Sequence, residues 1–224
     1  MDFSIRTFGR LLSHGFTGNG TLLSDMQLQR DFYERNTLLV ARELIGMRLV
    51  RLMDNVRLAG IIVEAEAYRG EEDLGCHAKA GYTSRTSVMY GPAGHAYVYF
   101  TYGKHWMLNF VTEQPGFPAA VLIRAIEMEE GREFVARRRS RQPFERWTDG
   151  PAKLCQALGI DGNLNGHDLC AQDATIFVES NHGNPIFALS VTTSPRVGLN
   201  NVPEPWKSIP WRYLATQKPA VMSK

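Results

Sequence analysis

The stretch Gly60–Tyr68, Gly-Ile-Ile-Val-Glu-Ala-Glu-Ala-Tyr, constrains the fold more than any other part of the chain. Successive side chains of a strand point to opposite faces, so Glu64, Glu66 and Tyr68 share one face, about 7 Å apart along the strand. The ordinary interpretation is a half-exposed strand with its polar face outward. Two features favour a functional strand. Glutamate is disfavoured in strands, and the strand runs into a polar loop that ends at Cys76-His77.

The rest of the chain consists of further short strand patterns separated by turn residues. Asp54-Asn55 lies between two such patterns and predicts a hairpin. Asn36 is a candidate helix N-cap, and Pro151 and Gly159 are placed to begin and end another helix. Because no strand–helix–strand repetition is present, we expect an α+β domain with a curved, mainly antiparallel sheet, a partial barrel, and flanking helices. Strands are expected at 47–53, 57–68, 95–103, 105–113, 119–126, 174–180, 187–193 and 211–215, and helices within 24–46, 131–146 and 149–160.

Length and composition are those of one globular domain. The 224 residues, 44% hydrophobic and 21% charged, can bury a core without disulfides. We read residues 1–23 as a flexible polar extension and 24–224 as the folded domain. The three cysteines are odd in number and widely spaced, which favours a reducing compartment. No apolar run is long enough to cross a bilayer, so we expect no membrane partner.

Positive charge is concentrated in one segment, although the net charge is only +2. Residues 131–146 form either a solvated helix face or a surface that contacts phosphates. The sequence leaves both interpretations open. The arginines of this segment are Arg132, Arg137, Arg138, Arg139, Arg141 and Arg146.

A second strand pattern places aromatic side chains on one face. Tyr97 and Tyr99 alternate with apolar residues, and Tyr102 follows immediately before Gly103, where the strand must turn. Such tyrosines are often scattered surface residues. Beside acids and arginines, however, they can stack on a flat base, at about 1–3 kcal/mol per base, or wedge between base steps. Carboxylates, aromatic rings and phosphate-binding arginines are the parts that a base-flipping enzyme needs.

Other chemistries lack their motifs. The sequence has no phosphate-binding G-x-x-x-x-G-K loop, no G-x-G-x-x-G, no G-x-S-x-G and no H-E-x-x-H. The isolated Cys76-His77 step lacks the further ligands of a metal site. We therefore expect no metal and no cofactor.

Several motifs, in order and at compatible spacing, resemble the alkyladenine (3-methyladenine, methylpurine) DNA glycosylase family. The resemblance covers the chain from about residue 27 to its end. It implies a compact α+β domain with a curved antiparallel sheet and no metal. The matching stretches are residues 61–78, 91–109, 119–127, 150–158, 171–174 and 195–198.

The resemblance also implies roles for individual residues. Glu66 resembles the general base that activates water, Tyr102 the residue that intercalates into the duplex, and Asn109 the residue that disfavours guanine. Arg85 and Arg137–Arg139 are candidates for phosphate contacts. Glu64 is not assigned the chemistry. The implied base pocket consists of Tyr68, His77, Tyr99, Asn109, Arg124 and Val197.

Two segments depart from the family pattern. The loop of residues 80–91 is about one residue short and lacks a Thr-Pro-Arg-Asn sequence, so DNA contacts there can differ, with Arg85 as a candidate contact. Lys104, His105 and Trp106 stand where the family has methionine and other residues, which bears on the fit to the damage site.

The activity implied is that of a monofunctional glycosylase on double-stranded DNA. The candidate bases are 3-methyladenine and 7-methylguanine, with hypoxanthine and ethenoadenine as further candidates. We expect a monomer, cytoplasmic and nucleoid-associated in a bacterium or nuclear in a eukaryote. Two alternatives stay open: a non-catalytic DNA-binding protein on the same scaffold, and a carbohydrate hydrolase that uses Glu64 and Glu66 as a carboxylate pair.

Overall fold

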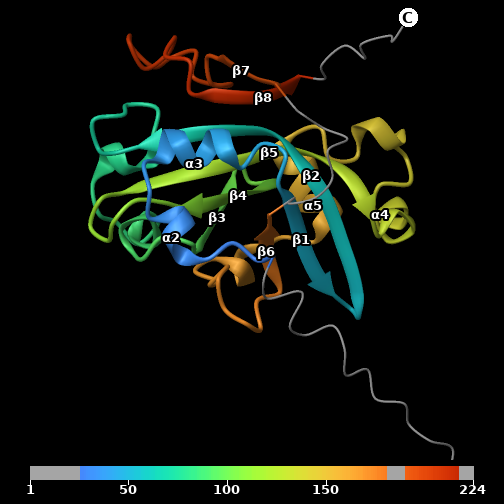
Figure 1. Cartoon of the computed structure of the whole chain (residues 1–224). Coiled ribbons are helices and arrows are strands. Elements are labelled where there is room, and N and C mark those ends of the chain that lie inside the picture. Colours follow the sequence, from blue (N-terminus) through green and yellow to red (C-terminus); the bar gives the residue numbers. More distant parts are fainter. Residues whose placement is uncertain (1–25, 181–189, 217–224) are drawn as a thin grey trace, which may run out of the picture.

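An antiparallel sheet forms the body of the molecule and curls into a half-barrel (Figure 1). The computed structural model describes residues 26–180 and 190–216. The strands run in the order β3-β4-β5-β2-β1-β6, and β8 pairs with both β2 and β7. This confirms the α+β class and the antiparallel curved sheet. The strands are β1 (Arg48–Met53), β2 (Val56–Arg69), β3 (Ala96–Thr101), β4 (His105–Val111), β5 (Ala119–Glu130), β6 (Ile176–Glu179), β7 (Ser190–Ser194) and β8 (Arg212–Thr216).

The central strand is β2, the strand with which the sequence analysis began. From Ala59 to Arg69 it pairs with β5 on one edge. On the other edge it pairs with β1 as far as Ile61, and from Glu64 to Glu66 it pairs with β8. Register shifts against β5 on both sides of Glu64 mark an irregularity of the kind that bends a strand. The strand therefore curves where its acidic residues begin.

The predicted hairpin between β1 and β2 is confirmed. Met53 pairs with Val56, and the two residues between them, Asp54 and Asn55, have φ angles of 51° and 60°. Both residue types tolerate this left-handed region better than most.

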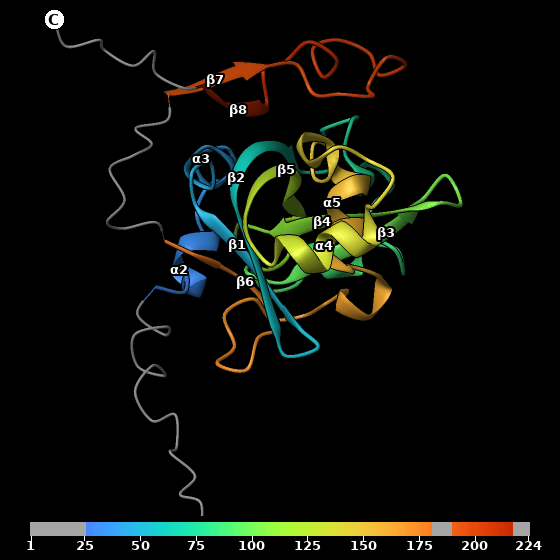
Figure 2. The same cartoon turned by 90° about the vertical axis from the view of Figure 1, so that its right-hand side faces the viewer.

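Helices cover the sheet from two sides (Figure 2). Asn36 is the predicted N-cap, and its side chain accepts a 2.9 Å hydrogen bond from the Leu38 amide. On the other side, Pro151 begins a helix that Gly159 ends at φ 61°, and Leu154 and Leu158 of that helix are fully buried in the core. The helices are α2 (Arg30–Tyr33), α3 (Thr37–Glu43), α4 (Arg132–Arg138) and α5 (Pro151–Leu158). None of the described helices is long and apolar enough to cross a membrane.

Two expected helical regions are wrong in extent. Residues 26–46 hold two short helices, because the cap at Asn36 starts a new helix after α2 has ended. The arginine-rich helix ends at Arg138. Pro143 lacks an amide hydrogen and disfavours helix before it, and only a short 3-10 turn, Phe144–Arg146, follows. The expected extension 1–23 and residues 187–189 of an expected strand lie outside the described residues.

Candidate active site

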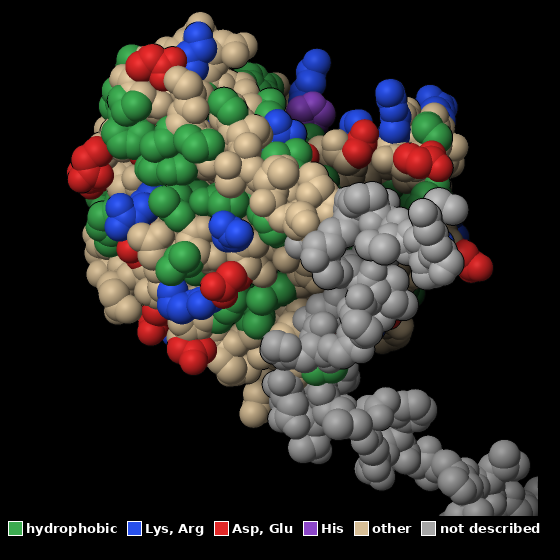
Figure 3. All heavy atoms as spheres, turned by 45° about the horizontal axis from the view of Figure 1, so that its top comes forward, with side chains coloured by type: hydrophobic (Ala, Val, Ile, Leu, Met, Phe, Trp, Pro, Cys, Tyr) green, Lys and Arg blue, Asp and Glu red, His purple; other side chains and the backbone are tan. Residues whose placement is uncertain are grey.

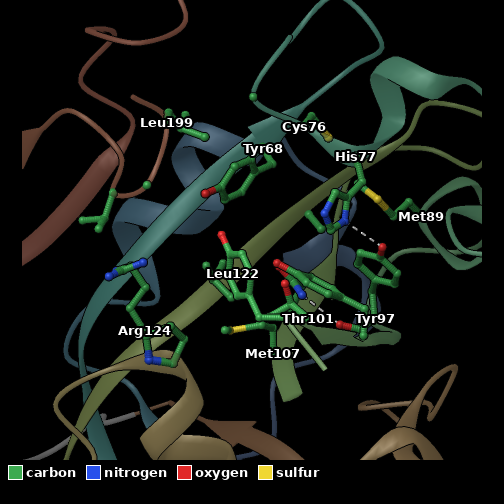
Figure 4. Close-up of a pocket in the computed structure, with 18 residues that line it drawn as sticks. Tyr68, Cys76, His77, Met89, Tyr97, Thr101, Met107, Leu122, Arg124 and Leu199 are labelled. Carbon is green, nitrogen blue, oxygen red and sulfur yellow. Dashed lines mark hydrogen bonds between the residues drawn. The ribbon is translucent and has the colours of Figure 1, made fainter. Parts of the chain in front are cut away.

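A pocket of about 290 Å³ lies between the end of β2, the β3–β4 hairpin and residues 197–199 (Figure 4). Tyr68 and Arg124 approach it from one side, and His77, Met89 and Tyr97 from the other. The structure thus brings together residues that lie far apart in the sequence. The seven residues assigned from the sequence to base binding or intercalation all line it: Tyr68, His77, Tyr99, Tyr102, Asn109, Arg124 and Val197.

Glu66 lies directly behind this lining and is 0% exposed, which corrects the picture of an outward polar strand face. The Val197 amide donates to its Oε1 at 2.7 Å, and the Tyr68 hydroxyl donates to its Oε2 at 2.8 Å. An Arg124 Nη1 lies 3.4 Å from Oε1. A carboxylate can accept about four hydrogen bonds, so these three neighbours leave one acceptor position of Glu66 unused.

The pKa of Glu66 is raised above its ordinary value. Burial, which penalises the charged form, is the largest cause. The Arg124 cation, the Val197 amide and the Tyr68 hydroxyl act in the opposite direction. A carboxylate with a raised pKa is a stronger base, and these three donors keep its ionised form accessible.

Glu64 has a different environment from Glu66. Its Oε1 accepts from Arg124 Nε at 2.6 Å and from Arg212 Nε at 2.7 Å. Glu64 therefore fixes the guanidinium of Arg124 and does not face the pocket as a free acid. This speaks against the carboxylate-pair hydrolase, which needs both acids at the scissile bond. The sequence analysis did not identify Arg212, because only the pairing of β8 with β2 brings it here.

Aromatic rings form the wall opposite Tyr68. The ring centroids of His77 and Tyr99 lie 4.5 Å apart at 74°, and those of Tyr97 and Tyr99 lie 5.3 Å apart. Burial, followed by the positive charges of Arg85 and Lys79, lowers the pKa of His77 to about 4. The imidazole is therefore neutral at physiological pH.

The tautomer of His77 depends on which atom donates in its contact with the Tyr97 hydroxyl. Its Nδ1 lies 3.0 Å from the Tyr97 hydroxyl (Figure 4). The Arg85 guanidinium, a group that can only donate hydrogen bonds, lies close enough to this hydroxyl to lower the pKa of Tyr97 against the effect of burial. The Tyr97 proton is therefore free to be given to Nδ1. A neutral imidazole that accepts at Nδ1 carries its proton on Nε2, where it can serve as a hydrogen-bond donor to a ligand.

Tyr102 and Asn109 differ sharply in exposure. Tyr102 stands at the tip of the β3–β4 hairpin with φ 51° and is 87% exposed. Asn109 is 3% exposed, and its Nδ2 donates to the Tyr97 carbonyl at 2.9 Å. This bond uses one of the two Nδ2 hydrogens, so Asn109, which lines the pocket, keeps both a donor and its Oδ1 acceptor.

The arginines proposed for phosphate contacts lie in two places. Arg85 is exposed and lines a neighbouring hollow on the other side of Tyr99, with its guanidinium 5.0 Å from the centroid of the Tyr99 ring. Arg137 and Arg138 lie on α4 and Arg139 caps its end, and none of the three lines the pocket. Arg138 stacks on Phe134, and Arg139 donates to the Arg146 carbonyl at 3.1 Å. On the face seen in Figure 3, positive and negative side chains are interspersed.

Across residues 26–180 and 190–216, His, Cys, Asp and Glu side chains form no group of three that could hold a metal ion.

Comparison with known proteins identifies the family. Residues 31–219 match the model of the methylpurine-DNA glycosylase family. The chain belongs to this family. It is 45% identical over 199 residues to a protein of Methanocella arvoryzae (88% of this chain, 96% of that one). It is 43% identical over 196 residues to a protein of Desulfitobacterium hafniense (84% and 94%). Both relatives carry the name "Putative 3-methyladenine DNA glycosylase".

The resemblance found from the sequence motifs is thereby confirmed. As a methylpurine-DNA glycosylase, the protein is a hydrolase of N-glycosyl bonds that acts on DNA in the repair of alkylated bases.

Proposed function

We propose that this glycosylase flips a damaged purine out of double-stranded DNA into the pocket and hydrolyses its bond to the sugar with water activated by Glu66. The observation that carries the proposal is a buried carboxylate immediately behind an aromatic-walled pocket, with an exposed aromatic beside its mouth. Tyr102 fills the vacated position in the duplex. The protein acts as a monomer.

The pocket suits a flat, electron-poor base. Tyr68 offers one ring face, and His77 and Tyr99 form the opposite wall. Alkylation at N3 or N7 makes a purine cationic, and a cation is attracted to aromatic faces. Asn109 adds selectivity, since its buried side chain crowds the position where guanine carries its exocyclic amino group and so disfavours that base.

For a cationic base, the chemistry then requires only Glu66 and water. The water oxygen forms a bond to C1′ and its proton passes to Glu66, while the C1′–N bond breaks and its electron pair leaves with the base. The negative carboxylate stabilises the positive charge that develops on the sugar, as in glycoside hydrolysis. The products are an abasic site and a free base.

We propose that the strand itself is not cleaved. Strand cleavage by a glycosylase needs an amine that forms a Schiff base with the sugar. No lysine occurs among the described residues that line the pocket.

The proposed substrates are 3-methyladenine, 7-methylguanine, hypoxanthine and ethenoadenine. The first two are cationic and leave readily. The neutral bases need a hydrogen-bond donor, and Nε2 of His77 is suited to this. Lesion selectivity therefore depends on the Tyr97–His77 pair.

Tyr97→Phe tests this dependence. The change removes the hydroxyl that fixes the tautomer of His77, so release of hypoxanthine should fall about 5- to 10-fold, the value of one hydrogen bond. Release of 7-methylguanine should fall less than about 2-fold, because a cationic base needs no such donor. Single-turnover rates on the two duplexes give the ratio. Tyr90→Phe is the control, since that hydroxyl donates to Glu71 outside the pocket. An unchanged ratio in Tyr97→Phe would rule out the tautomer argument.

The proposed function as a whole is tested by single-turnover assays on purified protein. The substrates are alkylated DNA and a duplex with one hypoxanthine, and base release is scored before and after alkali. We expect free base in both cases, with strand breaks only after alkali. Strand breaks without alkali would refute the monofunctional mechanism. Tight binding to damaged DNA without any base release would instead support the non-catalytic alternative.

A further inference from the structure

A buried ion pair that the proposed mechanism does not use joins two loops beside the pocket. Arg196 donates from Nη1 to Asp73 Oδ2 at 2.5 Å and from Nη2 to Asp73 Oδ1 at 2.7 Å, and both side chains are 0% exposed. The two residues are 123 positions apart in the sequence. Gly75 allows the close approach, because a Cβ there would lie 2.8 Å from the Arg196 guanidinium.

Arg196 also contacts the two elements that frame the general base. Its Nη1 donates to the Ala67 carbonyl at 3.0 Å, on the strand between Glu66 and Tyr68. Its guanidinium lies between two aromatic rings, 4.6 Å from the centroid of Tyr68 and 5.2 Å from that of Trp211. A planar guanidinium can stack and form a bidentate pair at the same time, which a lysine cannot do.

Val197, the next residue along the chain, makes the contact with the proposed general base. The Val197 amide donates to Glu66 Oε1 at 2.7 Å. Fixing the side chain of Arg196 on both sides fixes this peptide group, because the amide nitrogen is bonded to the carbonyl carbon of Arg196. On the other loop, Asp73 accepts from the Gly75 and Arg69 amides, and His77 follows four residues later.

We propose that Asp73 and Arg196 are positioning residues for base release, holding the Val197 amide against Glu66 and supporting the Tyr68 ring from behind. The proposal rests on the proposed function of Glu66. A buried pair is not by itself strongly stabilising, since desolvation offsets much of the attraction. Its bidentate geometry and its place between two walls of the pocket indicate a specific positional role.

The pKa of Glu66 shows whether Asp73 and Arg196 position the Val197 amide. Substitutions at these two residues leave the other charged and titratable neighbours of Glu66 in place. A carboxylate that loses a hydrogen-bond donor becomes harder to ionise. The groups that face Glu66 or its partners are Glu64 and Tyr68 from β2, Tyr99 from β3, Arg124 from β5 and Arg212 from β8.

The test compares two variants. Asp73→Asn keeps the shape of the Asp73 side chain but removes its charge. Arg196→Lys keeps the positive charge but removes the bidentate guanidinium and its stacking on the aromatic rings. The pKa of Glu66 is measured in DNA-free protein by carboxyl carbon NMR, with the resonance assigned through Glu66→Gln. We expect both variants to raise this pKa by about one. Base release near neutral pH should fall about 10- to 100-fold, with DNA affinity within about 2-fold of wild type.

Glu179→Gln is the matched control, because Glu179 is 1% exposed and pairs with Arg57 at 2.7 Å away from the pocket. It should lower the melting temperature without changing the pKa of Glu66 or the rate. A folded Asp73→Asn or Arg196→Lys protein in which Glu66 titrates as in wild type would overturn the proposal. If one variant does not fold, the other is enough for this test. The titration needs no activity, so a wild-type protein that releases no base would refute the proposed function and leave this test valid.

Discussion

Glu66→Gln should abolish most base release, by about 100- to 10,000-fold, the range that a general base contributes. Glutamine has the size of glutamate, and its amide oxygen can still accept from the Val197 amide, which lies 2.7 Å from Glu66. It cannot take a proton from water or oppose positive charge on the sugar. The pocket lining is unchanged, so affinity for damaged DNA should stay within about 3-fold of wild type.

The measurement is the single-turnover rate on a hypoxanthine duplex, together with binding to the same duplex. Glu127→Gln is the control, because Glu127 is an exposed residue of β5 away from the pocket. Retention of more than a tenth of the wild-type rate by Glu66→Gln would show that another group activates the water. The carbohydrate-hydrolase alternative would require an equal loss in Glu64→Gln on a glycoside, although Glu64 is already shared by Arg124 and Arg212.

The local patterns of the sequence predicted much of this site. Alternation along β2 placed Glu64, Glu66 and Tyr68 on one face, and the structure joins them through Arg124 and the Tyr68–Glu66 hydrogen bond. The resemblance to the family then implied which residues form the base pocket, and every one of those residues lines the same cavity. These features are predictable because a strand's period and a motif's spacing are local properties.

Burial and long-range pairing were not predictable in this way. Alternation alone indicated an exposed polar face, whereas β8 and the loop at Val197 cover Glu66 completely. No local sequence pattern predicts the contact between Arg196 and Asp73. It depends on how two loops that are distant in the sequence cross the end of the sheet. The length of α4 was overestimated for a simpler reason: arginine content favours a helix, but Pro143 prevents the helix from continuing through residue 146.

Arg124→Met should have the second largest effect, a loss of about 100- to 1,000-fold near neutral pH, comparable to removal of one preorganised donor from an active site. The Arg124 cation is the largest influence that lowers the pKa of Glu66 against the effect of burial. Without it, the pKa of this carboxyl rises further, and the ionised base is lost at pH values where the wild-type protein still holds it. Methionine fills a similar volume, and Arg212 stays bound to Glu64, so the local packing should be retained.

The pH dependence of the single-turnover rate on a neutral lesion separates this effect from simple misfolding. In wild type the rate should rise with pH through the raised pKa of Glu66, while His77, with its pKa near 4, is already neutral over most of that range. In Arg124→Met the same rise should occur at higher pH, and rates at the alkaline end should partly recover. Arg212→Met is the comparison, because the Arg212 side chain binds Glu64 while only its backbone pairs with Glu66, and its loss should stay below about 10-fold. A uniform loss at every pH, with no displacement of the rise, would mean that Arg124 acts on the DNA or the base and not through the ionisation of Glu66.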